Sequence, residues 1–401
     1  MSASDVATTN SDSAGTFDVS IIMPCLNEAE TLGSCIAKAM RWGHASGYSF
    51  EIVVADNGST DGSIDIATQM GARVVHVAER GYGAALWTGL ANAEGRWLIM
   101  GDADDSYDFS NLTPFLTAFE AGNDVVIGNR FQGGIAPGAM PWKNRYLGNP
   151  ILSWVGRNLF RIDVGDWHCG LRAITKQKFH ELDFRTSGME FASEMVIKTA
   201  LTDSRVAEVP TTLSVDGRSR RPHLKPWRDG WRHLRFMLLM SPRWLFTAPG
   251  LLVLALSAAL YVPLLVQPLQ LGRVVLDLRA MWISSSFVIL GYLLFMMGSV
   301  ARHLGRKDGL FDRAENGHRP QRQMLSLEVG ALIGVLCVLG GLVGTVVVVG
   351  RWGQVGFGDL YDRATLALIS LSSTLLMLGG VTLVFSLING FLDLPLRRSK
   401  S

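Results

Sequence analysis

Two aspartates, Asp102 and Asp104, stand two residues apart directly after the apolar run Trp97–Met100. Carboxylates at this spacing can share a hard divalent cation, because such ions prefer oxygen ligands and keep positions open for phosphate oxygens. A bare Asp-x-Asp triplet is common by chance, so the pair gains its weight from the strand-like run before it. The sequence therefore predicts a site where Mg²⁺ or Mn²⁺ holds a nucleotide diphosphate.

Polar clusters also follow two other apolar runs. One comprises residues 24–28, which read Pro-Cys-Leu-Asn-Glu, and the other comprises residues 56–62, which read Asp-Asn-Gly-Ser-Thr-Asp-Gly. A single cluster of this kind is usually a turn or a cap, and Ser59 or Asp61 could simply cap the next helix. Three clusters at the carboxyl ends of neighbouring strands would converge on one crevice, which is where open α/β sheets bind ligands.

Five further positions have both a functional and a structural interpretation. Gly81 and Gly83 lie where a helix is expected to begin, and glycines there let backbone N–H groups approach a phosphate, although a plain turn explains them equally well. Arg130 follows another apolar run, where it either reaches the crevice or forms a surface salt bridge. Glu190 and Glu194 share one face of a helix, where they would contact sugar hydroxyls, act as a base or face solvent.

These residues need a scaffold, and the chain from about Val19 to Thr212 reads as alternating short strands and helices. Short, continuously apolar runs are typical of parallel strands that are buried on both faces. The alternation predicts a doubly wound, Rossmann-like α/β sheet. The expected strands are 19–23, 52–55, 73–77, 97–100 and 125–127, and the expected helices are 29–40, 63–70, 84–93 and 112–121.

The C-terminal part of the chain has a different composition. Four windows contain no charged residue, although 18 % of the whole chain is charged. Each window holds about 20 residues or more, which is enough to cross a hydrocarbon core of roughly 30 Å. Such windows in succession, separated by charged loops, predict a transmembrane domain over residues 244–392. The windows are Trp244–Val266, Ala280–Val300, Val329–Gly350 and Ala364–Leu392.

Basic residues predict how these spans are oriented, because Lys and Arg concentrate in cytoplasmic loops. Eight lie between Arg218 and Arg243, six lie between the second and third windows, and three follow the fourth, whereas each of the other two loops holds two. Both termini and the α/β domain are therefore expected in the cytoplasm. Residues 1–16 lack the apolar core of a signal peptide and are expected to be a disordered tail, and residues 393–401 to be a cytoplasmic tail.

The basic segment 218–243 also carries an apolar stripe. Trp227, Trp231, Leu234 and Leu238 recur at helical spacing. Two tryptophans and eight basic residues just before a predicted span favour an amphipathic helix that lies in the membrane interface. A helix packed on its own soluble domain would show the same stripe.

A resemblance to a known family rests on three stretches, which are VSIIMPCLNEAETL from Val19, VVADNGSTDGS from Val53 and LIMGDADDSYDF from Leu98. They resemble the family 2 glycosyltransferases of GT-A fold, and among these the polyprenyl-phosphate glycosyltransferases, which include dolichol-phosphate mannose and glucose synthases. The resemblance covers about Val19 to Trp231, whereas the membrane half is similar only in architecture. It implies an inverting, metal-dependent transfer of a sugar from a UDP- or GDP-sugar to undecaprenyl or dolichyl phosphate.

The resemblance gives roles to single residues on the donor side. The nucleobase pocket would be bordered by Pro24, Asn27 and Glu28. Asp56 would contact the base or the ribose, and Asp102 would lie near the ribose and the metal. Gly81 and Gly83, considered above, would approach the phosphates.

On the metal side, the resemblance makes Asp104 the main metal ligand. Mannose synthases carry a glutamine two positions after this ligand, where the present chain has Ser106, so the third protein ligand stays open. The loop 166–172 falls where relatives carry an acceptor-side loop. Arg172 at its end therefore joins Arg130 and Asp104 as a catalytic candidate.

The lipid phosphate is expected to need cations of its own. It carries close to two negative charges and must approach an anionic diphosphate, and arginine suits bidentate contact with phosphate. Mannose-synthase relatives carry an arginine before a Ser-Lys-Leu-like stretch near this phosphate, and segment 218–225 matches that pattern approximately. Alternatively, these residues only obey the positive-inside bias. The candidates are Arg218, Arg220, Arg221 and Lys225.

Two other functions fit parts of the sequence. A processive polysaccharide synthase would carry Q-x-x-R-W after its catalytic domain, but residues 241–244 read Ser-Pro-Arg-Trp. A nucleotide-sensing transporter or assembly partner would need a polar path, which spans without charged residues do not offer. The expected partners are a nucleotide sugar, a polyprenyl phosphate and the bilayer, with no nucleic acid. Gly330-x-x-x-Gly334 and Gly340-x-x-x-Gly344 permit close helix packing and leave a homo-oligomer open.

Overall fold

The computed structural model describes residues 16–202, 204–219, 226–307, 326–359 and 362–393. The chain forms two compact units, Met1–Met237 and Leu238–Ser401. Most of the expected tails 1–16 and 393–401 lies outside the described residues, as do three acceptor candidates, Arg220, Arg221 and Lys225. The boundary between the units falls inside the basic segment 218–243 that the sequence places between its two domains.

The first unit contains a seven-stranded sheet of β1 (Phe17–Cys25), β2 (Phe50–Asp56), β3 (Arg73–His76), β4 (Gly95–Met100), β5 (Val125–Asn129), β6 (Arg172–Thr175) and β7 (Val206–Pro210). The strand order is β3-β2-β1-β4-β6-β5-β7. All neighbours are parallel except β6, which lies antiparallel between β4 and β5. The five expected strands are present, whereas β6 and β7 were not expected, and the antiparallel β6 makes the sheet mixed.

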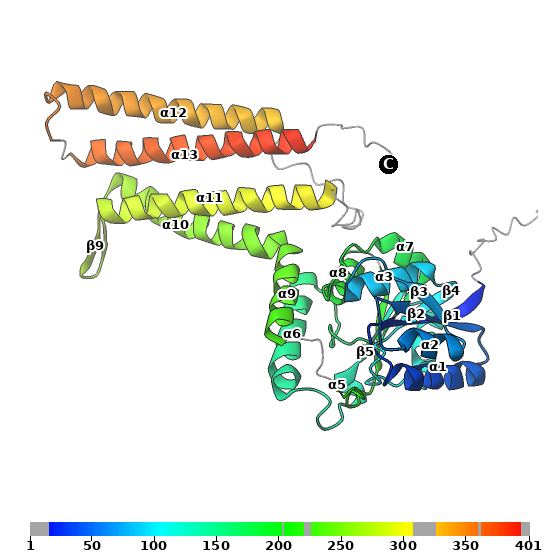
Figure 1. The fold of residues 1–401 in the computed structure, drawn as a ribbon. Helices are drawn as coiled ribbons and strands as arrows, with labels where there is room; N and C mark the ends of the chain where they lie inside the picture. The colour runs from blue at the N-terminus through cyan, green and yellow to red at the C-terminus, as the bar shows by residue number, and fades with distance from the viewer. Residues whose placement is uncertain (1–15, 203, 220–225, 308–325, 360–361, 394–401) are drawn as a thin grey trace, which may run out of the picture. The chain divides into compact units, whose positions relative to one another are not determined.

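The helices of this unit are α1 (Leu32–Ser46), α2 (Ser63–Gln69), α3 (Tyr82–Asn92), α4 (Thr113–Glu120), α5 (Arg130–Gly133), the π-helical turn η1 (Asn144–Gly148), α6 (Asn149–Phe160), α7 (Lys176–Leu182), α8 (Phe191–Leu201) and α9 (Pro226–Leu239). The first four confirm the expected helices. Figure 1 shows α1 and α2 on one side of the sheet and α3 on the other. Ile21 and Ile22, which point to opposite faces of β1, are accordingly both fully buried.

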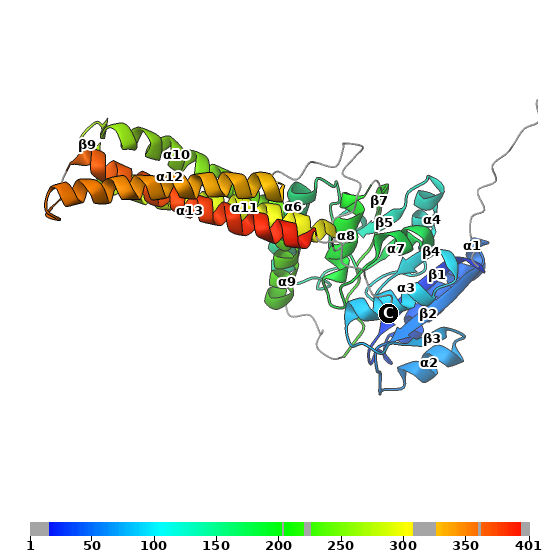
Figure 2. The same cartoon turned by 90° about the horizontal axis from the view of Figure 1, so that it is seen from above.

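The second unit contains η2 (Arg243–Thr247), α10 (Ala248–Val266), the hairpin strands β8 (Leu269–Leu271) and β9 (Val274–Leu276), α11 (Leu278–Lys307), α12 (Leu327–Gln354) and α13 (Arg363–Leu392). Four helices in the described part of the chain are long and apolar enough to cross a membrane. They coincide with the four uncharged windows. Figures 1 and 2 show α12 and α13 running side by side along their length.

Glycines bring the helices of each pair close together. In α10 and α11, a Cβ added at Gly250 would lie 2.6 Å from the backbone of the facing helix. In α12 and α13, a Cβ at Gly334 would lie 3.0 Å from the carbonyl oxygen of Gly379, and one at Gly341 would lie 2.8 Å from that of Ser372. Gly334 of the first repeat and Gly344 of the second therefore pack against the chain's own α13, and between them Gly341 rather than Gly340 makes the close contact. This packing gives no support to a homo-oligomer, which stays a prediction.

Hydroxyl groups also link these helices. The Tyr261 hydroxyl of α10 bonds to Ser370 at 3.2 Å and to Thr374 at 3.0 Å, both on α13. Ser285 of α11 bonds to the same Thr374 at 2.7 Å. Inter-helix hydrogen bonds of this kind help to hold transmembrane helices together, since the lipid itself offers a hydroxyl no partner. The hydroxyls therefore have a packing role.

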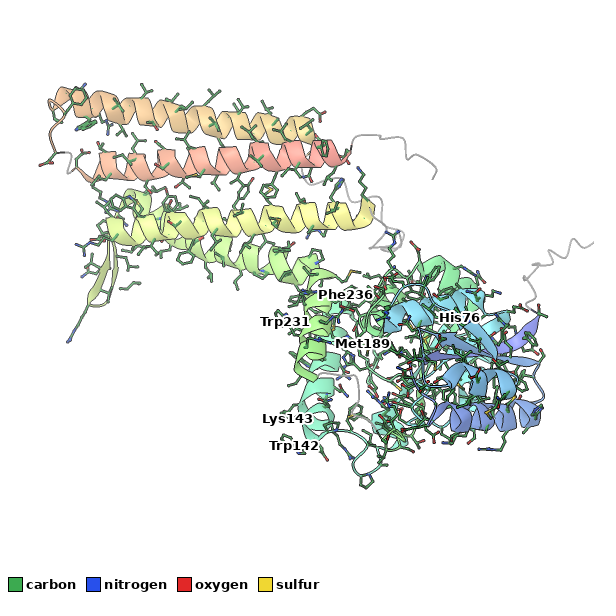
Figure 3. All side chains as sticks on the ribbon, viewed as in Figure 1. His76, Trp142, Lys143, Met189, Trp231 and Phe236 are labelled. Carbon is green, nitrogen blue, oxygen red and sulfur yellow. The ribbon has the colours of Figure 1, made fainter. Side chains whose placement is uncertain are left out.

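Helix α9 packs on the first unit and also exposes apolar side chains. His233 is buried and bonds to the Ser193 hydroxyl of α8 at 2.8 Å, and Met237 is fully buried. Trp231 is 59 % exposed. The sequence reasoning missed two further exposed aromatic side chains. Trp142 lies just before η1, and Trp154 lies on α6. Figure 3 shows Trp231 and Trp142 pointing away from the sheet.

Candidate active site

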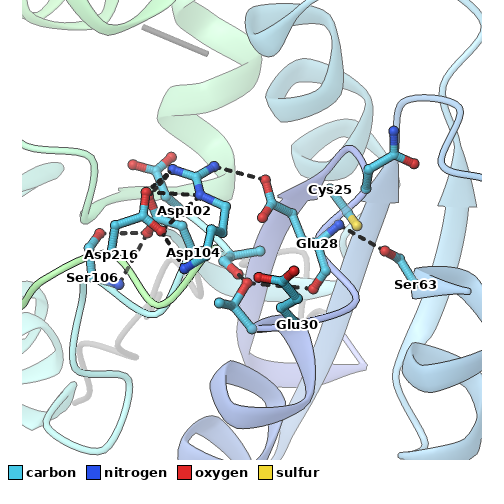
Figure 4. A network of polar contacts seen from close by, with 12 residues as sticks. Cys25, Glu28, Glu30, Ser63, Asp102, Asp104, Ser106 and Asp216 are labelled. Atoms are coloured by element: carbon cyan, nitrogen blue, oxygen red, sulfur yellow. Dashed lines mark hydrogen bonds and ion pairs between the residues drawn. The ribbon is translucent and has the colours of Figure 1, made fainter. Parts of the chain in front are cut away.

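Asp102 and Asp104 lie directly beyond the carboxyl end of β4. The Tyr82 hydroxyl, at the start of α3, donates to Asp102 Oδ1 at 2.8 Å. Asp104 Oδ1 accepts from the backbone N–H of Ser106 at 3.1 Å and from its hydroxyl at 2.5 Å. Figure 4 shows the two aspartates close together, with Ser106 beside Asp104. Ser106 therefore orients Asp104 through a local turn, whereas its role as a metal ligand stays a prediction.

The third acidic residue of this turn points elsewhere. Asp105 has a positive φ of 62°, a conformation that aspartate tolerates better than most residues. Its carboxylate pairs with Lys38 at 2.7 Å and accepts from the Ser34 hydroxyl at 3.0 Å, both on α1. The turn therefore sends one carboxylate to α1 and leaves Asp102 and Asp104 for the site.

Segment 213–218 runs alongside the aspartate turn. The Ser214 N–H donates to the carbonyl of Ser106 at 2.8 Å, and the Gly217 N–H donates to the carbonyl of Asp104 at 3.0 Å. These main-chain bonds act like one edge of a sheet and fix the register of the two segments. They carry the first basic residue after the α/β domain directly to the aspartates.

That residue, Arg218, lies at the centre of an acidic cluster. Its Nη1 is 3.0 Å from Glu28 Oε1, and its Nη2 is 3.0 Å from Asp104 Oδ2. Its Nε donates to the two carboxylate oxygens of Asp216 at 2.8 and 2.9 Å. Figure 4 shows Glu28 facing Asp104 and Asp216 from the side of β1. One guanidinium thus holds together three carboxylates, and the cluster remains negative.

These charges shift two pKa values. Burial raises the pKa of Asp102 to about 6, and the charge of Asp104 adds to this, while the hydrogen bond from Tyr82 opposes it. Burial lowers the pKa of Arg218, but the hydrogen bond to Asp216 and the charges of Asp104 and Glu28 outweigh burial and raise it. A carboxylate whose ionised form is disfavoured by a neighbouring carboxylate gains from a cation placed near both.

The loops after β1 and β2 are fastened to each other. Asn27, with φ of 59°, accepts from the Thr60 N–H at 2.7 Å, and its own N–H donates to the Ser59 hydroxyl at 2.9 Å. The Asp61 carboxylate accepts from the Ala29 N–H at 3.0 Å. Ser59 and Asp61 therefore join the loops after β1 and β2. Asp61 also accepts from the N–H of Ser63, the first residue of α2, at 3.1 Å, in line with the expected capping.

Two donor-side candidates lie at the ends of these strands. Asp56 is 3 % exposed, and its carboxylate accepts from the N–H groups of Gly58 and Ser59, each at 3.1 Å. Pro24 pairs with Ala55 in the β1–β2 ladder. Both are placed at the predicted edge of the sheet. The contacts of Asp56 stabilise its own loop, so its contact with a base or ribose stays a prediction.

The packing around Gly81 and Gly83 explains why both residues are glycines. Gly81 has φ of 151°, and a Cβ there would overlap the carbonyl oxygen of Ser187. A Cβ at Gly83 would lie 2.5 Å from the carbonyl oxygen of Thr186. An N–H of the first turn of α3 donates to the Ser187 carbonyl at 3.0 Å. The loop around Ser187 therefore occupies the helix N-terminus where the sequence placed a phosphate, and the phosphate contact finds no support in this packing.

The two glutamates near this loop anchor it. Glu194 is 1 % exposed and accepts from the N–H groups of Arg185 and Thr186 at 3.0 and 2.9 Å. Glu190 pairs with Arg232 of α9 at 2.9 Å. A solvated helix face is therefore wrong for Glu194, and neither carboxylate is placed here as a base.

Arg130 is neither open to the crevice nor on the surface. Its Nε and Nη2 bond to the two oxygens of Asp166 at 2.7 and 2.8 Å, and its backbone N–H adds a third bond at 3.1 Å. Asp166 is fully buried. Burial alone would lower the pKa of Arg130, but the hydrogen bonds and the charge of Asp166 outweigh it, and the pKa lies well above its ordinary value. This pair ties the start of α5 to the segment between α6 and β6, and direct catalytic contact stays a prediction.

Arg172 has no carboxylate partner among its hydrogen bonds in the described residues. Its guanidinium donates to three backbone carbonyls, those of Cys169, Trp167 and Ala192, through Nε at 2.5 Å, Nη2 at 2.6 Å and Nη1. It is 2 % exposed, and burial lowers its pKa. These contacts make Arg172 a brace for the loop 166–172 rather than a group that faces a substrate, so the catalytic assignment has no support here.

The sequence reasoning missed two residues of the site. Tyr82 contacts Asp102, and Asp216 holds Arg218. A signal existed for Tyr82, since it stands between the two glycines that were singled out. Asp216 lies just before the basic segment 218–243 and belongs to none of the motifs considered above. The role of Asp216 in the site depends on its contact with Arg218, which no local sequence pattern indicates.

The aspartate pair fits a divalent cation that is shared with a ligand. No group of three or more His, Cys, Asp or Glu side chains is placed to hold a metal within the described residues. Mg²⁺ usually takes one or two protein carboxylates and completes its shell with water and substrate phosphates. Asp104 already holds a cation in the form of Arg218, at 3.0 Å. Asp104 and Asp102 thus have the hard oxygen donors and the negative charge that such an ion requires.

Comparison with known proteins decides the family. Residues 20–192 match the model of glycosyl transferase family 2, and residues 299–393 match that of the glycosyltransferase family 2 C-terminal transmembrane region. The low-salt glycan biosynthesis hexosyltransferase Agl6 of Haloferax volcanii is 31 % identical over 372 residues, which cover 92 % of this chain and 87 % of that protein. The protein belongs to glycosyltransferase family 2.

This glycosyltransferase is also 31 % identical to the dolichyl-phosphate hexose transferase of Haloferax volcanii, over 53 % of this chain and 89 % of that protein. Among solved structures, glucosyl-3-phosphoglycerate synthase from Mycobacterium tuberculosis matches with a TM-score of 0.44 and 22 % identity, over 56 % of this chain and 79 % of that one. The expected family, the α/β catalytic domain with a transmembrane region, and the enzyme class are confirmed.

Proposed function

We propose that this glycosyltransferase transfers a hexose from a UDP- or GDP-sugar to a membrane polyprenyl phosphate, either undecaprenyl or dolichyl phosphate, with inversion at the anomeric carbon. One observation supports this most directly. Arg218, which suits a second phosphate, lies 3.0 Å from Asp104 of an aspartate pair that suits a diphosphate-bound cation, in a chain with four candidate membrane spans. The similarity to a dolichyl-phosphate hexose transferase points to the same acceptor class.

The proposed reaction is a single displacement. A phosphate oxygen of the acceptor attacks the anomeric carbon, a new carbon–oxygen bond forms, and the bond from that carbon to the diphosphate breaks. The nucleoside diphosphate leaves with the bonding electrons. A phosphomonoester has its second pKa near ~6, so at neutral pH the attacking oxygen has no proton to lose. A general base is then unnecessary, which agrees with the structural contacts of Glu190 and Glu194.

The residues take roles according to their chemistry. Asp104 and Asp102 would hold Mg²⁺ or Mn²⁺, which when bound supplies positive charge to the leaving diphosphate. Arg218 would neutralise the acceptor phosphate, helped by Arg220, Arg221 and Lys225, which lie outside the described residues. Pro24, Asn27, Glu28 and Asp56 would border the donor base and ribose. Positioning donor and acceptor in line would contribute much of the rate.

The test uses the full chain, purified in detergent and returned to lipid. It is incubated with each of a panel of labelled UDP- and GDP-hexoses, with undecaprenyl or dolichyl phosphate, and with Mg²⁺ or Mn²⁺. We expect one donor to give a labelled lipid that mild acid hydrolyses, and Asp104→Asn to abolish it. A product made without any polyprenyl phosphate would refute the acceptor assignment.

The same assay separates the rival functions. A processive polysaccharide synthase would yield a labelled polymer that stays acid-stable and does not extract into organic solvent. A nucleotide-sensing transporter or assembly partner would bind nucleotide without turnover. The family membership and the hexosyltransferase relative favour the enzyme.

We also propose that the catalytic unit and both termini are cytoplasmic, as the distribution of basic residues predicts. A single-cysteine probe at Trp352 should then react with an impermeant reagent outside intact cells, whereas a probe at Lys307 should not. The native cysteines Cys25, Cys35, Cys169 and Cys337 are replaced first. Labelling at position 307 alone would reverse the orientation.

A further inference from the structure

Arg218 makes contacts that a lipid-phosphate ligand alone does not explain. It binds Glu28 and Asp104 at 3.0 Å each, and its side chain is only 12 % exposed. A guanidinium that merely awaited an acceptor phosphate would have no reason to lie against the predicted metal ligand. The same oxygen, Asp104 Oδ2, would serve both cations.

The main chain on both sides of Arg218 is fixed. Before it, the Gly217 N–H donates to the carbonyl of Asp104 at 3.0 Å. After it, the Ser219 N–H and hydroxyl donate to the two carboxylate oxygens of Glu30 at 2.6 and 2.5 Å. The position of the arginine is therefore set by the fold on each side and does not depend on its own rotamer alone.

We propose that Arg218 is a built-in cation that occupies the cation position at Asp104 in the ligand-free enzyme, and that binding of the divalent cation moves it away from Asp104. This inference rests on the proposed function for its last step, in which the released guanidinium meets the acceptor phosphate. A unit charge and a divalent cation about 4 Å apart repel each other by several kcal/mol at an effective dielectric constant of about 20. Arg218 and the metal cannot share Asp104 without that cost, so they compete.

Release of Arg218 does not leave it unpaired. Asp216 stands two residues before it and binds it through Nε at 2.8 Å and also through Nη2. Because this carboxylate lies two residues away on a loop whose main chain is fixed, it stays bound while the arginine side chain turns away from Asp104, and the large penalty for an unpaired charge is avoided. Glu28 and Asp104 are the partners that the arginine gives up when it turns toward the acceptor phosphate.

This competition has a functional consequence. Without nucleotide the metal must displace Arg218 unaided, so the ligand-free enzyme binds it weakly. When the donor supplies phosphate oxygens, metal and donor bind together and free the arginine. The acceptor phosphate then finds a cation that was not available before. Donor therefore binds before acceptor, and the lipid is not held unproductively.

The test measures Mn²⁺ binding to the full-length protein in detergent, without nucleotide, from the electron paramagnetic resonance signal of free Mn²⁺. The variant is Arg218→Gln, which keeps a polar side chain, although a shorter one, and removes the charge. We expect it to bind Mn²⁺ at least about tenfold more tightly than the wild type. Arg218→Lys, which keeps a charge but cannot bridge Glu28 and Asp104 with a planar fork, should lie between the two.

Two controls make the result specific. Arg232→Gln removes a positive charge from the same unit at the Glu190 pair, and should leave Mn²⁺ affinity unchanged, which excludes a general charge effect. Asp104→Asn combined with Arg218→Gln should lose the gain, which places the ion at Asp104. Equal or weaker Mn²⁺ binding by Arg218→Gln overturns the inference.

The outcome is independent of the sugar-transfer assay. If the wild type fails to glycosylate any polyprenyl phosphate while Arg218→Gln still tightens Mn²⁺ binding, the proposed function fails and the competition stands. If transfer occurs and Mn²⁺ affinity does not change, the competition alone fails. Acceptor-first binding in a product-inhibition study of an active enzyme would also refute the proposed order.

Discussion

Two arginines of the catalytic unit are held by carboxylates in very different ways. Arg130 meets one carboxylate, Asp166, which is fully buried, in a two-pronged pair at 2.7 and 2.8 Å. Arg218 meets three carboxylates with Asp102 close by, and although Glu28 is buried, the side chains of Asp104 and Asp216 are 16 % and 25 % exposed. The first region is balanced in charge and closed to water. The second is rich in negative charge and partly open, so it can accept a further cation.

The difference separates a brace from a working group. Breaking a buried pair leaves an uncompensated charge in a medium of low dielectric constant, so neither partner can leave. A partly exposed cluster is screened by water, and each of its contacts contributes little on its own. Arg218 can therefore exchange partners, whereas Arg130 cannot. Four predictions use this contrast, taken from the largest expected effect to the smallest.

The largest effect should follow Asp104→Asn. It removes the expected main metal ligand, and loss of several kcal/mol of charge stabilisation lowers turnover by about a thousandfold. The measurement is sugar-lipid formation by the purified protein at limiting Mn²⁺. Asp105→Asn is the matched control, because this neighbouring aspartate faces Lys38 of α1 and should keep most of the turnover. Normal turnover by Asp104→Asn would sink the assignment.

Next in size is the effect of Arg130→Met on stability. It leaves Asp166 buried without its partner, which costs about 3–5 kcal/mol. Arg218→Met, in the partly exposed cluster, should cost about 1 kcal/mol or less. Both are measured as the free energy of unfolding of the catalytic unit, by chemical denaturation of the full-length protein. If the two variants lost equal stability, the contrast between brace and working group would be wrong.

An intermediate effect is expected for the acceptor. Replacing Arg218 and Arg221 together by Ala removes charge-assisted contacts worth about 1.5–3 kcal/mol. The apparent KM for polyprenyl phosphate should rise about ten- to a hundredfold, while the donor KM at saturating metal changes little. Unchanged acceptor kinetics together with mixed membrane insertion would identify the arginines as topology signals.

The smallest effect should come from Ser106→Ala. Its hydroxyl donates to Asp104 Oδ1 at 2.5 Å, so its loss should weaken Mn²⁺ binding by up to about tenfold. Ser110→Ala is a matched control, since Ser110 makes the same bond to Asp108 at 2.5 Å on an exposed turn. Mn²⁺ titration in the presence of nucleoside diphosphate compares the two. An equal effect of both variants would mean that Ser106 acts on the turn only.

The sequence by itself determined the elements and the position of the aspartates. Uncharged windows gave the four spans, because hydropathy depends only on residues within about 20 positions. Short apolar runs gave five strands, and parallel strands that end together put Asp102 and Asp104 at one edge of the sheet. The repeat that begins at Gly330 indicated close helix packing, which α12 and α13 realise.

Some details lay beyond local patterns. The antiparallel β6 is four residues long and has no periodicity to detect. Gly341 and Gly344 make the close contacts with α13, whereas a Cβ at Gly340 would lie 3.8 Å from Leu375, because the contact face of a helix depends on where its partner lies. The glycines at the start of α3 pack against a loop whose residues lie about a hundred positions later in the chain.

The roles of the arginines were decided only by the tertiary structure. Arg218 finds Asp104 across 114 residues and Glu28 across 190 residues. Arg172 turns to backbone carbonyls and Arg130 to a buried carboxylate. A guanidinium has the same sequence signature whether it donates to carbonyls, carboxylates or a phosphate, and its partners are brought together by the packing of distant segments. The sequence could therefore supply the cations, while the fold determined which of them is free to work.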